Sequence, residues 1–354
     1  MINIFQEGEK RVKWNKEIDA TKTIATILVV IGHAITAEYR TGFLGALWLV
    51  IYSFHMFLFF AISGYLFQFN LERYVKNKKQ FCLKKVRQLI FPYITITIAV
   101  YSILLVSSRV PALYNMLGKP EITIPGFLQA LLLNIEHYDV HLWYIYRLFF
   151  IFMINIALSK LTMRFEFLVL CIVLNLVPNF TAQYLPIAGG LIKWMIPFWV
   201  GRYVSREAKE LTCNQIKGSI CLGILIFGVV ASYYLDNMII NDIAVGTVRR
   251  AVVQLIGLLT GITGSYLLCV FVKYIVHRRN IVKLLAKISV YTYDIYLLHQ
   301  PFIVVGTVKV LSRFNTGAIS VAVAVIAGLS IPALCSKYIL RRSTLARKFL
   351  LGQE

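Results

Sequence analysis

Long apolar runs follow one another along the chain, most of them about 17–25 residues, the length of an α-helix that crosses a bilayer. Hydrophobic residues make up 58% of the sequence and charged residues only 15%. A soluble domain carries charge at about a quarter of its positions. We therefore predict an all-α polytopic membrane protein.

The runs predict a bundle of about ten transmembrane helices. The expected spans are 17–37, 44–69, 89–107, 141–159, 165–178, 191–203, 216–235, 250–272, 289–312 and 316–336. The segment 124–136 is an alternative eleventh span, or a re-entrant or interfacial segment. With ten spans and the N-terminus inside, most of the 37 Lys and Arg residues fall in cytoplasmic segments, as the positive-inside rule requires. Counting 124–136 as a full span would place the later basic loops outside. We therefore predict that both termini are cytoplasmic.

The whole chain, 1–354, is expected to form a single transmembrane domain with a short basic segment 1–16 and a cytoplasmic tail 337–354. The loops 70–88 and 273–288 are predicted to be cytoplasmic, and the first is too short to bury a core. Basic residues in such loops set orientation and contact anionic head groups, so the net charge of +21 does not indicate a nucleic-acid partner. The six cysteines lack metal-like spacing, and no metal is expected.

His33, near the end of the first apolar run, is the leading candidate for chemistry. A charged group in a membrane helix costs about 2.5 kcal/mol or more, so such residues mark pathways or reaction centres. Histidine also exchanges its proton near neutral pH, which suits a general base. Lys22 precedes it by eleven residues, almost three turns, which puts both on one helix face about 16 Å apart. This pair suits a ligand with a phosphorylated head and a long reactive arm. The alternatives are a snorkelling lysine and a histidine hydrogen-bonded between helices.

The second run and the loop after it hold further candidates. His55 is either a polar contact between helices or a substrate ligand, and Ser63-Gly64 is a small pair that lets another backbone approach closely. Lys84 and Arg87 are three residues apart and share a face if the third helix begins early. They would then hold phosphates, whereas the alternative is a simple topology signal.

Two more groups lie in later runs. His141, Trp143 and Arg147 are at the outer end of the fourth run, where aromatic side chains anchor a helix at the interface or stack on a sugar ring. In the ninth run, Tyr296 and His299 contribute to a polar stripe along one helix face.

The motifs also occur in the order found in a known family. They are Asp19-x-x-Lys22 with Val30-x-x-His33, the run 54–67, Lys84-x-x-Arg87 with Phe91-Pro92, His141-Leu142-Trp143-Tyr144 and Tyr296-Leu297-Leu298-His299. Over nearly its whole length the chain resembles the integral-membrane acyltransferase family 3, and most closely the branch of fucose 4-O-acetylase-like sugar O-acetyltransferases. Two positions depart from the family. Many members have Arg at the position of Lys22, and the familiar paired arginines before the third helix are here only Lys84 and Arg87.

The resemblance implies a single acyltransferase-3-like domain in a bacterial plasma membrane. It would transfer an acetyl group from cytoplasmic acetyl-CoA, its co-substrate, to a hydroxyl of a cell-surface polysaccharide or other glycan. His33 would be the catalytic base or acyl relay. The expected donor ligands are Lys22, Lys84 and Arg87, and the expected acceptor ligands are His55, His141, Trp143, Arg147, Tyr296 and His299. Expected partners are the glycan and membrane lipid, and a homodimer is left open.

Two other functions compete with this one. A permease or flippase for a glycan or lipid-linked sugar would use the histidines as a proton relay. A sensor protein would keep the helical bundle without the activity. The sequence has no internal repeat of the kind many transporters show, which counts against the permease.

Overall fold

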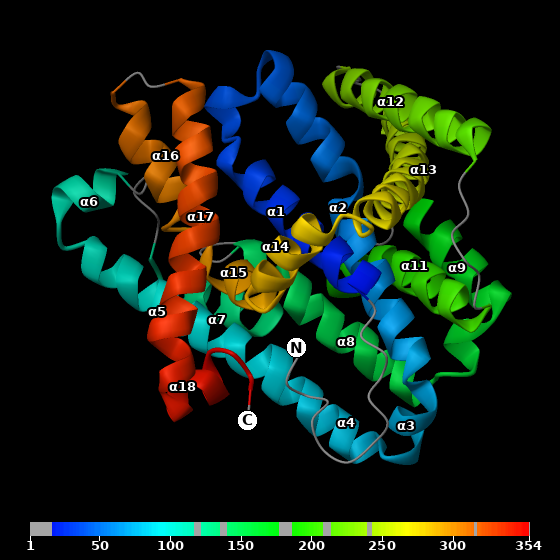
Figure 1. Cartoon of the computed structure of the whole chain (residues 1–354), viewed down its shortest axis with the longest axis horizontal. Helices are drawn as coiled ribbons and strands as arrows, with labels where there is room; N and C mark the ends of the chain where they lie inside the picture. Colours follow the sequence, from blue (N-terminus) through cyan, green and yellow to red (C-terminus); the bar gives the residue numbers. More distant parts are fainter. Residues whose placement is uncertain are drawn as a thin grey trace. The chain divides into compact units, whose positions relative to one another are not determined.

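The computed structural model describes residues 16–116, 122–134, 140–176, 186–207, 214–238, 243–314 and 317–353. Throughout these ranges the regular elements are helices (Figure 1). The chain folds into two compact units. Unit 1 comprises Met1–Gly32, Arg40–Lys76 and Ile154–Val290, and unit 2 comprises His33–Tyr39, Asn77–Met153 and Tyr291–Glu354. The prediction of one transmembrane domain over 1–354 stays a prediction.

Unit 1 holds most of the long helices. They are α1 (Lys16–Ala34) up to Gly32, α2 (Gly42–Phe69), α3 (Leu71–Lys76), η5 (Leu161–Met163), α9 (Phe165–Leu176), α11 (Pro186–Arg206), α12 (Gln215–Asn237), α13 (Ile243–Ile275) and α14 (Arg279–Ser289). Helices α12 and α13 pack side by side, as Figure 1 shows.

Helices α2 and α11 cross with their backbones in contact. A Cβ added at Gly64 of α2 would collide with the carbonyl group of Phe198, and one added at Gly201 of α11 would collide with that of Ala61. Small residues permit this close packing of membrane helices. The structure thus confirms the prediction that Ser63-Gly64 admits another backbone.

The segment 273–288 differs from the predicted loop because most of it is helix α14. Its apolar residues recur with helical spacing, while Arg279, Lys283 and Lys287 occupy the other face. Leu285 is buried against Ala20 of α1. A basic amphipathic helix of this kind suits the membrane–water interface.

Unit 2 is built from shorter helices. They are η2 (Ala37–Tyr39), α4 (Lys78–Lys85), η3 (Val86–Ile90), α5 (Phe91–Ser107), α6 (Pro111–Met116), α7 (Ile124–Leu133), η4 (Val140–Leu142), α8 (Trp143–Ala157) up to Met153, α15 (Thr292–Leu298), α16 (Val304–Ser312), α17 (Ala318–Tyr338), η6 (Leu340–Arg342) and α18 (Thr344–Phe349). The last two residues of α1 also belong to this unit.

Within the described residues, five helical stretches are long and apolar enough to cross a membrane. They are Gly42–Phe69, Lys78–Ser107, Gln215–Asn237, Val245–Ile275 and Ala318–Arg342. These correspond to the second, third, seventh, eighth and tenth predicted spans. Helices α8 and α9 are apolar but only 15 and 12 residues long. The count of ten spans therefore stays a prediction.

Three regions test the predicted boundaries. The segment 70–88, predicted as a loop, is helical, and α4 continues through the π-helical turn η3 into α5. The run 289–312 is not one helix but α15 and α16, separated at Pro301, because proline supplies no backbone N–H for a continuing helix.

Helix α7 covers only ten residues, about 15 Å of rise against a hydrocarbon core of about 30 Å. It is therefore too short to be an eleventh full span.

Candidate active site

Three imidazole rings, those of His33, His141 and His299, lie close together in unit 2. The ring centroid of His299 is 5.3 Å from that of His33 and 5.6 Å from that of His141. The three residues come from the end of α1, from η4 and from the end of α15. We call these residues the histidine cluster. Sequence reasoning named all three, and the fold brings them together from positions more than a hundred residues apart.

The ring of His299 is held in one orientation. It is fully buried, and its Nδ1 lies 2.9 Å from the carbonyl oxygen of Tyr296 and 3.0 Å from that of Ile295. Since a carbonyl oxygen can only accept, these contacts place a proton on Nδ1. The other nitrogen, Nε2, then carries the lone pair, and it is buried without a hydrogen-bond partner in the part of the chain that is described. A neutral imidazole in this state can accept a proton.

His141 and Tyr296 connect η4 to α15 through two hydrogen bonds. The Nε2 of His141 lies 3.2 Å from the carbonyl oxygen of Leu297, to which it donates. The hydroxyl of Tyr296 donates to the carbonyl oxygen of His141 at 2.7 Å. These contacts fix the position of both residues beside His299. The sequence predicted them as acceptor ligands, and that role is not tested by the contacts.

An aromatic surface extends from the histidine cluster along α8. The ring of Tyr144 is 5.7 Å from that of Tyr296 and 6.4 Å from that of Trp143. The guanidinium carbon of Arg147 lies 4.9 Å from the centre of the Trp143 ring. These side chains are partly exposed. Partly exposed aromatic rings, here packed edge to face, with a nearby cation suit a polar ring such as a sugar.

Asp294 holds α15 in place and was not predicted as a site residue. Its side chain is fully buried, and its Oδ2 accepts hydrogen bonds from Ser336 at 2.5 Å and from Nη2 of Arg341 at 2.7 Å. The hydrogen bond with Ser336 ties α15, which ends just before His299, to α17, and the ion pair with Arg341 ties it to η6. The signal in the sequence was a carboxylate inside an apolar run, which a membrane helix tolerates only when it is paired.

His55 lies in unit 1. It is buried in α2, its Nδ1 donates to the carbonyl oxygen of Ile51 at 2.7 Å, and its ring is 5.0 Å from that of Tyr52. These contacts fit the structural alternative, a polar group packed within a helix. Its role as an acceptor ligand stays a prediction.

The three predicted donor ligands fall in different units. Lys22, in unit 1, makes an ion pair of 2.6 Å with Asp19 one turn earlier. Lys84 and Arg87, in unit 2, lie at the end of α4 and in the π-helical turn η3. Arg87 is exposed and Lys84 partly exposed. None of these contacts tests the prediction that they bind a phosphate.

Lys85, next to this pair, is a residue that sequence reasoning missed. Its ammonium nitrogen lies 4.2 Å from the centre of the Phe152 ring and 5.6 Å from that of Phe81. Phe81 precedes Lys85 by four residues, and this spacing places them on one helix face. This four-residue spacing is the feature of the sequence from which the contact of Lys85 with Phe81 could have been predicted. Lys85 thus stabilises the packing of α4 on α8.

A metal site is not formed by the described residues, among which no group of three or more His, Cys, Asp or Glu side chains is placed to hold an ion. The expectation that the protein needs no metal stays a prediction.

The sequence itself matches a family model. The model of the acyltransferase 3 family, described as an acyltransferase domain, matches residues 15–337. The chain belongs to this family. No curated protein and no solved structure matches the chain. With its long apolar helices, this member of the acyltransferase 3 family is a membrane acyltransferase, and a permease or flippase is not favoured.

Proposed function

We propose that this acyltransferase transfers an acetyl group from acetyl-CoA to a hydroxyl of a cell-surface glycan, with His33 as the catalytic base or acyl relay. The observation that carries this proposal is the pair of rings of His33 and His299, 5.3 Å apart, beside the unpartnered Nε2 of His299. A proton-accepting imidazole in a buried setting is the group that hydroxyl activation requires.

The direct reaction is a single exchange at the acetyl carbonyl carbon. His33 takes the proton of the acceptor hydroxyl, and the hydroxyl oxygen forms the new C–O bond. The C–S bond of the thioester breaks, the CoA thiolate leaves, and the proton passes from the imidazolium to the thiolate. In the two-step alternative, the His33 nitrogen first takes the acetyl group and releases CoA, and the acceptor hydroxyl then attacks the acetyl-imidazole. Both routes end with an O-acetyl ester and CoA.

His299 is assigned the role of a proton acceptor next to His33. Its Nδ1 is tied to the carbonyl oxygens of Ile295 and Tyr296, so that Nε2 alone is available as a base. The Asp294–Arg341 ion pair supports this geometry by fixing α15. A second base beside the first keeps the catalytic imidazole neutral between turnovers.

The acceptor is expected to lie on the aromatic surface formed by Trp143, Tyr144 and Tyr296. Their partly exposed rings can stack on a sugar, and Arg147 can meet its hydroxyl or carboxylate groups. A glycan acceptor would place the chain in the fucose 4-O-acetylase-like branch, which the motif order favours.

The loop charges favour ten spans with both termini in the cytoplasm of a bacterial cell. In that arrangement Lys84 and Arg87 are at the cytoplasmic side, where acetyl-CoA is available. Membrane lipid surrounds the helices, and a homodimer is left open.

If Lys84 and Arg87 contact the phosphates of CoA, Lys84→Gln and Arg87→Gln should each raise the KM for acetyl-CoA. Charge-assisted hydrogen bonds are worth about 1.5–3 kcal/mol, so we expect roughly a ten- to hundredfold increase. The KM for the acceptor should hardly change. Steady-state kinetics with each substrate varied in turn would measure both values.

Lys79→Gln is the matched control, because Lys79 is an exposed residue of the same helix. Lys22→Arg tests the third donor ligand, since arginine keeps a phosphate contact but cannot release a proton. We expect this variant to keep its donor affinity. Equal KM values in wild type, Lys84→Gln and Arg87→Gln would show that the two cations only orient the helix.

The activity itself is tested with the purified full-length protein in detergent. Incubation with acetyl-CoA and a panel of glycans should release free CoA and form O-acetyl ester in equal amounts. The same incubation with longer acyl-CoA donors determines the donor preference. A failure to form ester with every acceptor, together with no glycan-stimulated release of CoA, would support the inactive sensor instead.

A further inference from the structure

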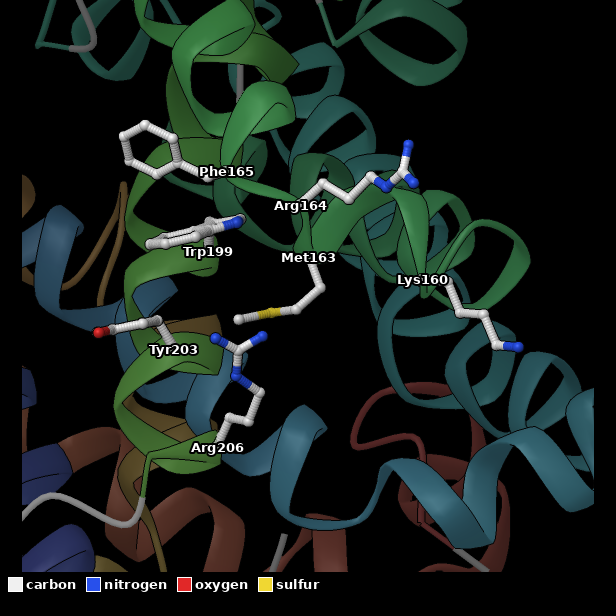
Figure 2. A pocket seen from close by; sticks show the side chains of 7 residues that line it. All are labelled: Lys160, Met163, Arg164, Phe165, Trp199, Tyr203 and Arg206. Carbon is white, nitrogen blue, oxygen red and sulfur yellow. The ribbon is translucent and has the colours of Figure 1, made fainter.

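A cavity of about 340 Å³ lies in unit 1, between the last turns of α11 and the segment that joins α8 to α9. None of its lining residues belongs to the histidine cluster or takes part in the proposed acyl transfer. Its lining includes three cations, Lys160, Arg164 and Arg206, and two stacked aromatic rings, Trp199 and Tyr203 (Figure 2). The cavity is thus both basic and aromatic.

One face of α11 supplies the back wall. Trp199, Tyr203 and Arg206 are spaced by four and three residues, which aligns them on the helix surface. The rings of Trp199 and Tyr203 stack at 5.2 Å with an interplanar angle of 6°. The guanidinium carbon of Arg206 lies 5.6 Å from the centre of the Tyr203 ring. The wall is therefore ordered before a ligand binds.

The indole N–H of Trp199 has no hydrogen-bond partner in the described parts of the chain, although the side chain is only 9% exposed. A buried donor without an acceptor is unfavourable, so a ligand oxygen at this point would be stabilised. In Figure 2 the indole nitrogen points to the side on which Met163 lies, and the guanidinium of Arg206 reaches toward the same side. Lys160 and Arg164 extend away from the rim, as exposed side chains that can fold over a ligand.

The charge around the cavity is positive. Arg206 pairs with Glu207 at 3.0 Å, whereas neither Lys160 nor Arg164 has an ion-pair partner among the residues described. Large apolar side chains are exposed beside these cations. Phe165 is 67% exposed and Leu161 47% exposed. A ligand that is anionic at one end and apolar at the other fits both features.

The position of the cavity also indicates a membrane boundary. It lies where α8 ends, where α9 begins and where α11 ends, so the apolar helices reach water at this level. The loop charges predict that this is the cytoplasmic side, where anionic lipids attract basic residues.

We propose that this cavity binds the phosphate headgroup of an anionic membrane phospholipid. The indole N–H of Trp199 and the guanidinium of Arg206 donate to the phosphate oxygens. Arg164 and Lys160 close over it from the rim, and the acyl chains follow the exposed rings and side chains around Phe165. A phosphate on a soluble molecule, such as CoA, offers the same oxygens, and the experiment separates the two sources.

The test is a titration of the detergent-solubilised full-length protein with phosphatidylglycerol and with phosphatidylcholine, read by native mass spectrometry. Trp199→Phe keeps an aromatic ring beside Tyr203 but removes the N–H together with the five-membered ring, and Arg206→Gln removes the charge. We expect the affinity for phosphatidylglycerol to fall severalfold in the first variant and about tenfold in the second. Phosphatidylcholine should bind more weakly to wild type and respond little to either change.

Lys217→Gln is the matched control, since Lys217 is an exposed cation in the first turn of α12, at a helix end outside the cavity. Equal losses in Lys217→Gln and Arg206→Gln, or equal binding of both lipids to wild type, would overturn the proposal. So would a calorimetric titration in which Trp199→Phe weakens CoA binding but leaves phosphatidylglycerol binding unchanged. Circular dichroism shows whether each variant is folded, and Trp199→Phe alone decides the outcome if Arg206→Gln does not fold.

Discussion

We expect His33→Ala to lower kcat for acetyl transfer by about a hundred- to ten-thousandfold, the range typical of a lost general base. Folding and membrane insertion should be unaffected, because alanine is small and neutral and His33 is only partly buried at the end of α1. His299→Asn should cause a loss within the same range, since it removes the basic Nε2 beside His33 while keeping a side-chain donor. Release of free CoA in the presence of glycan measures both variants.

His55→Asn is the matched control for these substitutions. His55 is also a buried histidine of a membrane helix, with one hydrogen bond to a backbone carbonyl oxygen. It belongs to unit 1 and is not one of the three residues of the histidine cluster. We expect less than a tenfold loss of kcat, because its contacts are those of a packed polar group and the loss of an acceptor ligand would instead raise the KM for the acceptor. Full activity in His33→Ala would refute the mechanism, and a loss in His55→Asn as large as in His33→Ala would mean that the effect comes from disturbed packing.

Arg202→Met should destabilise unit 1 by about 3 kcal/mol, because it leaves several buried acceptors without a donor. Arg202 is only 1% exposed. It donates to Asn155 at 2.7 Å, Thr162 at 2.8 Å, the carbonyl oxygen of Ser159 at 3.0 Å and Gln68 at 3.1 Å. These bonds join α2, α8, η5 and α11.

The measurement is the midpoint of thermal unfolding of the purified protein in one detergent. Arg164→Met is the control, as Arg164 is an exposed residue of unit 1 directly after η5 and should change stability by less than about 0.5 kcal/mol. If Arg202→Met unfolds at the wild-type temperature, the buried guanidinium contributes little and the helices are held by apolar packing alone.

The histidine cluster illustrates what a sequence of this type reveals. An imidazole in an apolar run is visible without a structure, because the bilayer penalises it, and this identified His33 and His299. The pair Ser63-Gly64 also predicted close helix packing from the sequence alone, because small residues let another backbone approach. The residues that contact them could not be predicted, since contacts between segments more than a hundred residues apart leave no periodic signal in the sequence.

The positions at which helices begin, end and break are harder to predict than whether a segment is apolar or basic. The basic segment 70–88 has the charges of a cytoplasmic loop, yet lysine and glutamine also favour helix, and α3 and α4 form there. The run 289–312 has the apolar content of one span, although Pro301 marks the break. Arg202 lies at the edge of a predicted span, where a cation is expected to reach water, and only the structure shows its four acceptors, two of them buried.

The central claim is that His33 and His299 together perform acyl transfer. The most direct measurement is the single-turnover transfer of a radiolabelled acetyl group from acetyl-CoA to a glycan, by wild type and by the variant carrying both His33→Ala and His299→Asn. We predict rapid formation of labelled O-acetyl glycan by wild type and no transfer above background by the double variant. Transfer at the wild-type rate in the double variant would contradict the account.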